Sequence, residues 1–169
     1  MNRVHLTAWM AAVAVGLLGC EYDLDTAAFE PLAREAGPGY HIVEPIDQID
    51  WRDGPVGLPP GSEFAVLEGD PAEPEIFTMY LRLPDGYVIP PHWHPNVERV
   101  TVLRGTFHLG HGSRFDADAT QALPAGSYTS MPAGMEHFAF AEGETMLQLT
   151  SIGPWEIEYI DPADDPRLE

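Results

Sequence analysis

Short stretches of apolar and alternating residues, each closed by Gly, Pro or Asp, recur along the chain from about Tyr40 onward. They follow one another at intervals near 8–12 residues and are rich in β-branched and aromatic side chains, a pattern typical of β-sandwiches and barrels. No stretch in this region has a long period of 3.6 residues. The predicted strands span residues 64–70, 75–86, 98–112, 126–134, 136–143 and 145–153. The pattern predicts an all-β fold, a small antiparallel β-barrel or jelly roll.

The first residues follow a different pattern. Residues 1–19 begin with a positive charge at Arg3 and continue with an apolar stretch too short for a comfortable membrane span, as in a secretory signal. The stretch ends in Leu-Leu-Gly-Cys, with Cys20 last, and resembles the lipobox of bacterial lipoproteins, in which the cysteine is lipidated. A plain signal peptide with a chance cysteine is the alternative. Both interpretations predict an exported protein. The lipobox further predicts that the protein belongs to the bacterial cell envelope and is held at a membrane by its lipid anchor alone.

Composition changes give the expected domain boundaries. Residues 20–39 are rich in Asp, Glu, Pro and Gly and are expected to form an acidic tether. Residues 40–163 are expected to form the barrel domain, and residues 164–169 a polar tail. The chain of 169 residues is long enough for one domain with a buried core. Its single cysteine leaves no disulfide within the chain.

The net charge of the chain limits the classes of partner that it is expected to bind. With 27 acidic and 8 basic residues, its formal net charge is -19 at pH 7. Nucleic-acid binding requires clustered Lys and Arg, so this charge argues against a nucleic-acid partner and favours a hydrated surface. The sequence has no Gly-x-Ser-x-Gly motif and no thiol besides Cys20. Nucleophilic covalent catalysis therefore has no candidate residue.

The stretch PPHWHPNVERVTVLRG, residues 90–105, brings together residue types that bind metals. Because side chains alternate along a strand, His92, His94 and Glu98 share one parity and are expected to face the same side. In a barrel interior these groups would be costly to bury unpaired, and a divalent transition metal would pair them. The alternative is a set of exposed polar residues on an edge strand. His137, on a later predicted strand, supplies a fourth candidate ligand.

The spacing of these residues resembles the two motifs of the cupin superfamily. The first motif is matched by Gly86, His92, His94, Glu98 and Gly105, and the second by Gly126, Pro132, Gly134 and His137. Ala141 stands where the second motif ends in Asn, a departure that affects subfamily placement more than the metal ligands. The resemblance implies a small β-barrel with one metal ion bound by His92, His94, Glu98 and His137. Ligand softness alone does not choose among Fe, Mn, Ni, Cu and Zn.

The resemblance leaves the reaction open. Four protein ligands leave an octahedral ion two positions for water, dioxygen or a chelating substrate. Cupins use this arrangement in dioxygenases, isomerases, decarboxylases and lyases, and some only bind or sense a ligand. We therefore expect a metal-dependent enzyme, dioxygenase- or isomerase-like, acting on a small organic molecule, or else a non-catalytic metal- or small-ligand-binding protein. Cupins commonly pair through strands at the barrel edge, so a homodimer is a further expectation by resemblance.

Further residues are candidates for the pocket beside the metal: Met79, Arg82, Tyr128 and Gln148. Met79 is expected on an apolar inner face, and Gln148 is the polar residue most expected to point inward late in the barrel. The alternatives are an ordinary core position for Met79 and backbone hydrogen bonding for Gln148. His108 and His111 are expected on the surface or rim, and Trp155 is expected to pack the final strand.

Overall fold

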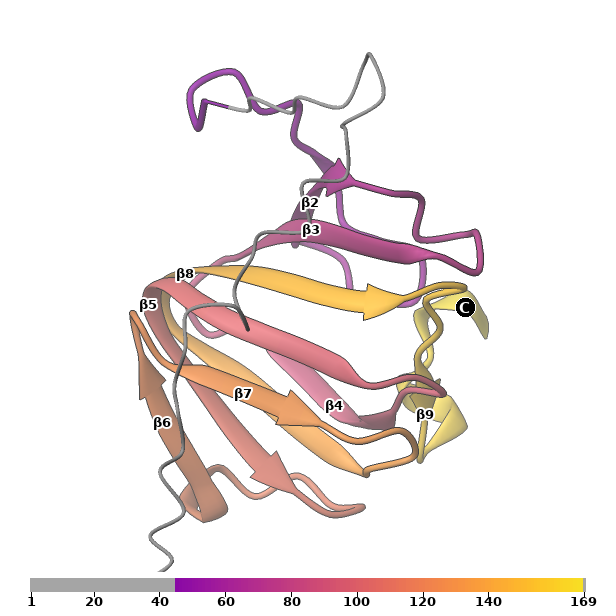
Figure 1. The fold of residues 1–169 in the computed structure, drawn as a ribbon. Helices are drawn as coiled ribbons and strands as arrows, with labels where there is room; N and C mark the ends of the chain where they lie inside the picture. The colour runs from indigo at the N-terminus through magenta and orange to yellow at the C-terminus, as the bar shows by residue number, and fades with distance from the viewer. Residues whose placement is uncertain (1–44, 169) are drawn as a thin grey trace, which may run out of the picture. The chain divides into compact units, whose positions relative to one another are not determined.

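The structure, a computed structural model, describes residues 45–168 and consists mainly of β-strands joined by short turns (Figure 1). The strands are β1 (Arg52–Asp53), β2 (Glu63–Glu68), β3 (Ile76–Leu83), β4 (Val88–Trp93), β5 (Glu98–His111), β6 (Thr120–Pro124), β7 (Tyr128–Met131), β8 (His137–Ile152) and β9 (Glu158–Tyr159). The 3-10 helices of the described residues are η2 (Ala117–Ala119), η3 (Pro162–Asp164) and η4 (Pro166–Leu168). Within residues 45–168, no helix is both long and apolar enough to cross a membrane. The predicted signal, Cys20 and the acidic tether lie outside the described residues.

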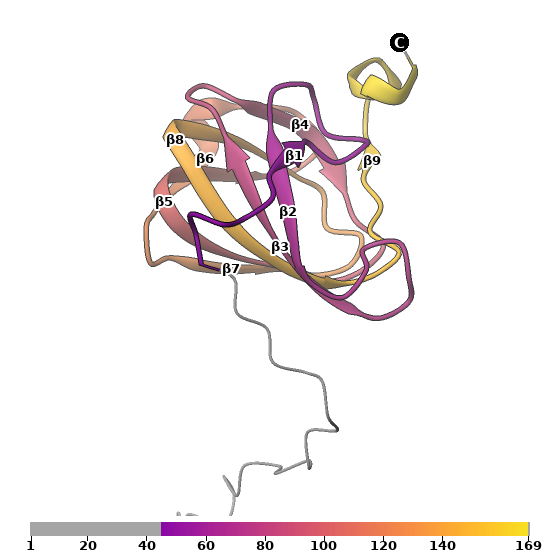
Figure 2. The same cartoon turned by 90° about the horizontal axis from the view of Figure 1, so that it is seen from above.

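Two long antiparallel strands, β5 and β8, organise the sheet. Residues 145–152 of β8 lie between β3 and the start of β5, and residues 137–140 lie between β4 and the end of β5. Strands β2 and β1 extend the first half of the sheet beyond β3, and β9 extends the second half beyond β4. Strands β7 and β6 pair with the two halves of β5. The sheet therefore curls around an interior (Figure 2), and the predicted antiparallel jelly-roll barrel is confirmed.

The bend in the β5–β8 ribbon lies at Gly105. The backbone there has a φ of 74°, in the left-handed region, and the register of β5 against β8 shifts just before Gly105 and again across it. A Cβ at this position would lie 2.6 Å from the carbonyl oxygen of Glu144. Glycine meets both requirements, which gives a physical reason for the glycine that closes residues 90–105. The predicted strands 136–143 and 145–153 are joined as one strand, β8, because the ribbon bends here without a turn.

Alternating side chains along the strands form the core. In β3, Phe77, Met79, Leu81 and Leu83 are buried, and the residues between them are half-buried. Strand β8 alternates in the same way around Leu147 and Leu149. These residues join one apolar cluster inside the curled sheet. Burying each such side chain stabilises the fold by about 1.5–3 kcal/mol, and this cluster holds the strands that carry the site in place.

Candidate metal centre

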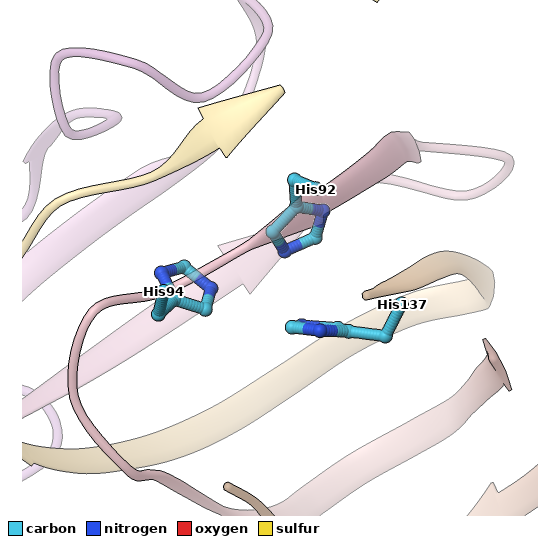
Figure 3. Close-up of side chains that lie close together, drawn as sticks. All are labelled: His92, His94 and His137. Atoms are coloured by element: carbon cyan, nitrogen blue, oxygen red, sulfur yellow. The ribbon is translucent and has the colours of Figure 1, made fainter. Parts of the chain in front are cut away.

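Three histidine rings converge where β4 meets β8 (Figure 3). His92, near the end of β4, lies directly opposite His137, the first residue of β8, in the antiparallel register. His94 directly follows β4. All three residues are buried, and one nitrogen from each ring lies within 4.8 Å of the other two. The three rings could therefore hold one metal ion between them.

Glu98 approaches this cluster from β5. It is 6% exposed, with its Oε1 3.5 Å from Nε2 of His94 and its Oε2 3.9 Å from Nε2 of His137. The expectation that one strand carries the first two histidines and Glu98 is wrong, because β4 ends at Trp93 and β5 begins at Glu98. A turn separates them, and the N–H of Gly134 donates to the carbonyl oxygen of His94 at 2.8 Å. The carboxylate reaches the histidines through this turn and not through strand parity.

A backbone carbonyl orients each histidine ring. The Nδ1 atoms of His92, His94 and His137 lie 2.7, 2.6 and 2.8 Å from the carbonyl oxygens of Pro90, Glu156 and Met135, respectively. Because a carbonyl oxygen only accepts hydrogen bonds, the network assigns the proton of each ring to Nδ1. In the neutral ring, the lone pair on Nε2 then stays free for a metal. The rings thus have the tautomer and orientation that metal ligation requires.

Burial also favours the neutral form of two of these rings. It lowers the pKa of His92 well below the ordinary value of 6.5, and the neighbouring histidines lower it further. Burial lowers the pKa of His137 too, against an opposing effect of Glu98. Neutral imidazole is the form that binds metals, so both shifts reduce competition from protons near pH 7. Imidazole nitrogens beside a carboxylate suit Fe, Mn, Ni, Cu or Zn.

The histidines and Glu98 open onto a small apolar cavity inside the barrel. The remaining lining consists of Leu58, Leu81, Ile89, Val100, Phe107, Ala139, Leu147, Leu149 and Trp155. The space open to the centre of a water-sized molecule is about 20 Å³, which is room for about one water. In this conformation the cavity accommodates an ion or a very small ligand, and an organic molecule of ordinary size would need more room.

The sequence model of the ChrR cupin-like domain family matches residues 40–156. The chain belongs to this family. The cupin resemblance predicted from the two motifs is thereby confirmed. No curated protein matches the chain.

Solved structures show the same cupin fold. An RmlC-like cupin from Shewanella frigidimarina NCIMB 400 is 19% identical, over 69% of this chain and 94% of that protein, with a TM-score of 0.53. The polyketide cyclase RemF from Streptomyces resistomycificus is 15% identical, over 75% and 90% of the two chains, with a TM-score of 0.58. A candidate acetylacetone dioxygenase from Methylibium petroleiphilum PM1 is 20% identical, over 76% and 88%, with a TM-score of 0.55. At these identities the likeness concerns the fold.

Two predicted pocket residues lie outside the cavity lining of the cupin barrel. Met79 is 1% exposed and belongs to the core. This agrees with the alternative prediction of an ordinary core position for this residue. Gln148 is half-buried on the face of β8 opposite to its two leucine neighbours, Leu147 and Leu149, which line the cavity. The expectation that Gln148 points inward is therefore wrong. Strand alternation gives the inward positions to the leucines.

The other two predicted pocket residues lie away from the cavity. Arg82 forms an ion pair with Glu63 at 2.8 Å, and its guanidinium lies 3.9 Å from the centre of the Trp51 ring. Tyr128 is 60% exposed on β7. Neither residue lines the cavity. His108 forms a hydrogen-bonded pair with Glu142 at 2.7 Å, away from the three clustered histidines.

Trp155 lines the cavity, although the sequence suggested only a packing role at the final strand. Its ring stacks on His94, with centroids 5.5 Å apart and planes at 24°. Its Nε1–H donates to Oε1 of Glu98 at 3.4 Å. Trp155 lies in an irregular segment between β8 and β9. The hydrophobic pattern of this segment does not indicate that Trp155 faces the cavity.

Proposed function

We propose that this cupin is a metal-dependent enzyme, dioxygenase- or isomerase-like, that acts on a small organic substrate. The metal ligands are His92, His94, Glu98 and His137. The observation that supports the proposal is the convergence of three imidazoles, each with Nδ1 hydrogen-bonded to a backbone carbonyl, beside a buried carboxylate. A divalent transition metal bound there would supply Lewis-acid or redox chemistry at the positions that protein atoms leave open.

The residues around the ligands orient them and exclude water. The backbone carbonyls keep the Nδ1 protons in place, so that each Nε2 faces the metal position. The apolar lining strengthens electrostatic interactions at the reacting atoms by excluding water. Leu58 lines both this cavity and an outer groove. A substrate larger than the cavity requires a lining side chain such as Leu58 to move.

Metal analysis of the purified protein tests the binding step. The protein is equilibrated with Fe²⁺, Mn²⁺, Ni²⁺, Cu²⁺ or Zn²⁺ in turn, desalted and analysed for bound metal. We expect about one ion per chain for at least one metal, lost in His137→Ala and kept in His111→Ala, whose side chain is exposed. Wild-type protein that retains none of these metals would contradict the proposal.

A second function, metal or small-ligand binding without turnover, is favoured by the cavity lining. Among the residues that the structure describes, the lining supplies no acid or base besides the candidate ligands, and its space suits about one water. Oxygen uptake and product analysis with metal-loaded protein, screened against phenolic and diketone compounds, separate the two functions. Product formation that His137→Ala abolishes supports the enzyme. A thermal shift with a ligand, and no product with any metal or redox condition, supports the binding protein.

Export and lipid anchoring through Cys20 form a separate proposal, supported by the lipobox-like sequence and the apolar stretch before it. In bacterial cells fed a labelled fatty acid, the full chain should take up label and fractionate with membranes, whereas Cys20→Ala should not be labelled. Equal labelling of both chains would contradict acylation at this cysteine. The homodimer stays a prediction, which light scattering of the purified protein checks.

A further inference from the structure

We propose that Trp155 is a positioning residue of the metal centre, holding His94 and Glu98 in the arrangement that binds the ion. This inference rests on the proposed metal-binding function. Trp155 is not itself a ligand, because its indole nitrogen only donates hydrogen bonds. It acts through two of the four candidate ligands.

The indole hydrogen bond orients the carboxylate of Glu98. The Nε1–H of Trp155 donates to Oε1 at 3.4 Å, whereas Oε2 is the oxygen on the side of His137, 3.9 Å from its Nε2. Glu98 is the first residue of β5 and is 6% exposed, so water does little to orient or stabilise its charge. A donor on Oε1 restricts rotation of the carboxylate plane. Both oxygens then stay beside the histidines, with Oε1 3.5 Å from Nε2 of His94.

The same segment holds His94 in two ways. The indole ring of Trp155 stacks on the imidazole at 24°, with centroids 5.5 Å apart, which restricts the tilt of the ring. The backbone carbonyl oxygen of the next residue, Glu156, accepts a hydrogen bond from Nδ1 of His94 at 2.6 Å. Trp155 and Glu156 together therefore control the ring plane and the tautomer of His94. Trp155 also controls the carboxylate plane of Glu98.

Contacts with the loop before β3 anchor the backbone that carries Trp155. The N–H of Trp155 donates to the carbonyl oxygen of Pro71 at 2.7 Å, and the N–H of Gly153 donates to that of Glu75 at 2.9 Å. A Cβ at Gly153 would come within 2.2 Å of the carbonyl oxygen of Glu73, so the two segments approach as closely as glycine allows. The indole is thus fixed by protein contacts that do not involve the metal position, which preorganises the two ligands.

Trp155 also separates the cavity from the outside. It lines the metal cavity on one side and, with Val56 and Phe64, an outer groove on the other. Its ring therefore lies between solvent and the ligands that it positions. This placement favours slow exchange of a bound ion in addition to correct ligand geometry.

Competition with a chelator measures the effect of Trp155 on metal affinity. Trp155→Phe keeps an aromatic ring beside His94 and removes the hydrogen bond to Glu98, and Trp155→Leu removes both contacts. We expect Trp155→Phe to weaken metal binding about 10-fold or more, and Trp155→Leu to weaken it further, since residues that orient ligands typically change affinity 10–100-fold. The Co²⁺-loaded variants should also show an altered visible absorption spectrum, because the ligand geometry changes.

Trp51→Phe is the matched control, since Trp51 stacks on Tyr80, away from the cavity lining. It should leave the affinity and the Co²⁺ spectrum unchanged. Wild-type affinity and an unaltered spectrum in Trp155→Phe would overturn the inference while leaving the metal site intact. A wild-type protein that binds no metal would instead contradict the proposed function itself.

A measurement on the unaltered chain covers the case in which the Trp155 variants do not fold. In ¹⁵N-labelled protein, titration with Zn²⁺ should shift the indole N–H resonance of Trp155, because its acceptor carboxylate becomes a metal ligand. The indole resonance of Trp51 should stay in place. Metal binding without any shift of the Trp155 resonance would overturn the inference.

Discussion

At the scale of single residues, burial and one hydrogen bond favour the neutral form of two candidate ligands, His92 and His137. His92 and His137 are buried, and burial lowers the pKa of both rings. Their Nδ1 atoms donate to carbonyls two residues earlier in the chain, at Pro90 and Met135. The same local backbone geometry thus recurs on two strands and leaves both Nε2 atoms facing the common point.

We expect the metal-free protein to lose stability as the pH falls through the ordinary histidine pKa of 6.5. In the unfolded chain His92 and His137 take up protons near that pH, whereas in the folded chain their lowered pKa values keep them neutral. The unfolded state then binds more protons, so the free energy of unfolding falls by up to about 1.4 kcal/mol per pH unit for each ring. The loss is complete only below the folded-state pKa values.

Urea denaturation of metal-free protein, at pH values on both sides of 6.5, measures this dependence. His92→Gln removes one of the two titrating rings and should give a shallower decline in the free energy of unfolding. Gln121→Asn, at an exposed position without a titrating group, should follow the wild type. Parallel curves for wild type and His92→Gln would show that burial of this ring does not carry the effect.

At the scale of elements, the bend of the β5–β8 ribbon places the ligands on facing parts of the sheet. Glu98 lies before the bend in β5, and His137 begins the half of β8 that pairs with β4. Gly105 makes the bend possible through its left-handed backbone and its close approach to β8. The geometry of the site therefore depends on a residue outside it.

Gly105→Ala should destabilise the fold more than Gly143→Ala. Both positions have a φ above 70°, so both substitutions carry the cost of a left-handed alanine, about 1–2 kcal/mol. At Gly105 a Cβ would also lie 2.6 Å from the carbonyl oxygen of Glu144, whereas at Gly143 it would have no atom of the described residues within 4 Å. Urea denaturation should give a difference of at least about 1 kcal/mol between the variants. Equal losses would mean that the ribbon absorbs the contact without strain.

At the scale of the whole molecule, the segment of residues 54–62 forms part of the cavity wall through Leu58. Leu58 is 7% exposed and lines the cavity from this segment. Two tyrosines from other parts of the barrel hold the segment: the hydroxyl of Tyr159 donates to the carbonyl oxygen of Gly57 at 2.7 Å, and that of Tyr87 to Oγ of Ser62 at 3.2 Å. One wall of the cavity thus comes from a segment distant in sequence from every candidate ligand.

Leu58→Ala should speed the removal of bound metal by a chelator, because it opens the cavity toward the outer groove. The rate is measured by rapid mixing of metal-loaded protein with excess chelator. Val56→Ala is the matched control, since Val56 lies on the same segment and is 85% exposed. Identical rates in Leu58→Ala and the wild type would show that ligands reach the site by another path.

Metal binding should stabilise the domain as a whole, because the site joins β4, β5 and β8. An ion at about 100 times its Kd adds about 2.7 kcal/mol to the free energy of unfolding, provided that it binds only the folded chain. Thermal melts of wild type with and without metal measure the effect, and His94→Ala should show little of it. A wild-type melt that metal leaves unchanged would count against a site built by the folded barrel.

Local sequence patterns predict much of the barrel and its candidate ligands. The alternation in residues 76–83 predicts a strand with one buried face, and β3 has that face. His92, His94 and His137 were predicted from residue type and motif spacing, and their rings lie together. These features depend on neighbours a few residues apart, or on spacing that the chain itself displays.

The remaining features depend on contacts between distant segments, and only the tertiary structure shows them. Glu98 approaches the histidines after a turn and not along one strand, Gln148 faces away from the cavity, and Trp155 reaches the ligands through contacts with the loop before β3. The cavity size likewise follows from the packing of Leu58 against the barrel. The sequence by itself determined which side chains were available to bind a metal. Long-range packing decided which of them meet, because it sets the path of the irregular segments, where no periodic pattern exists.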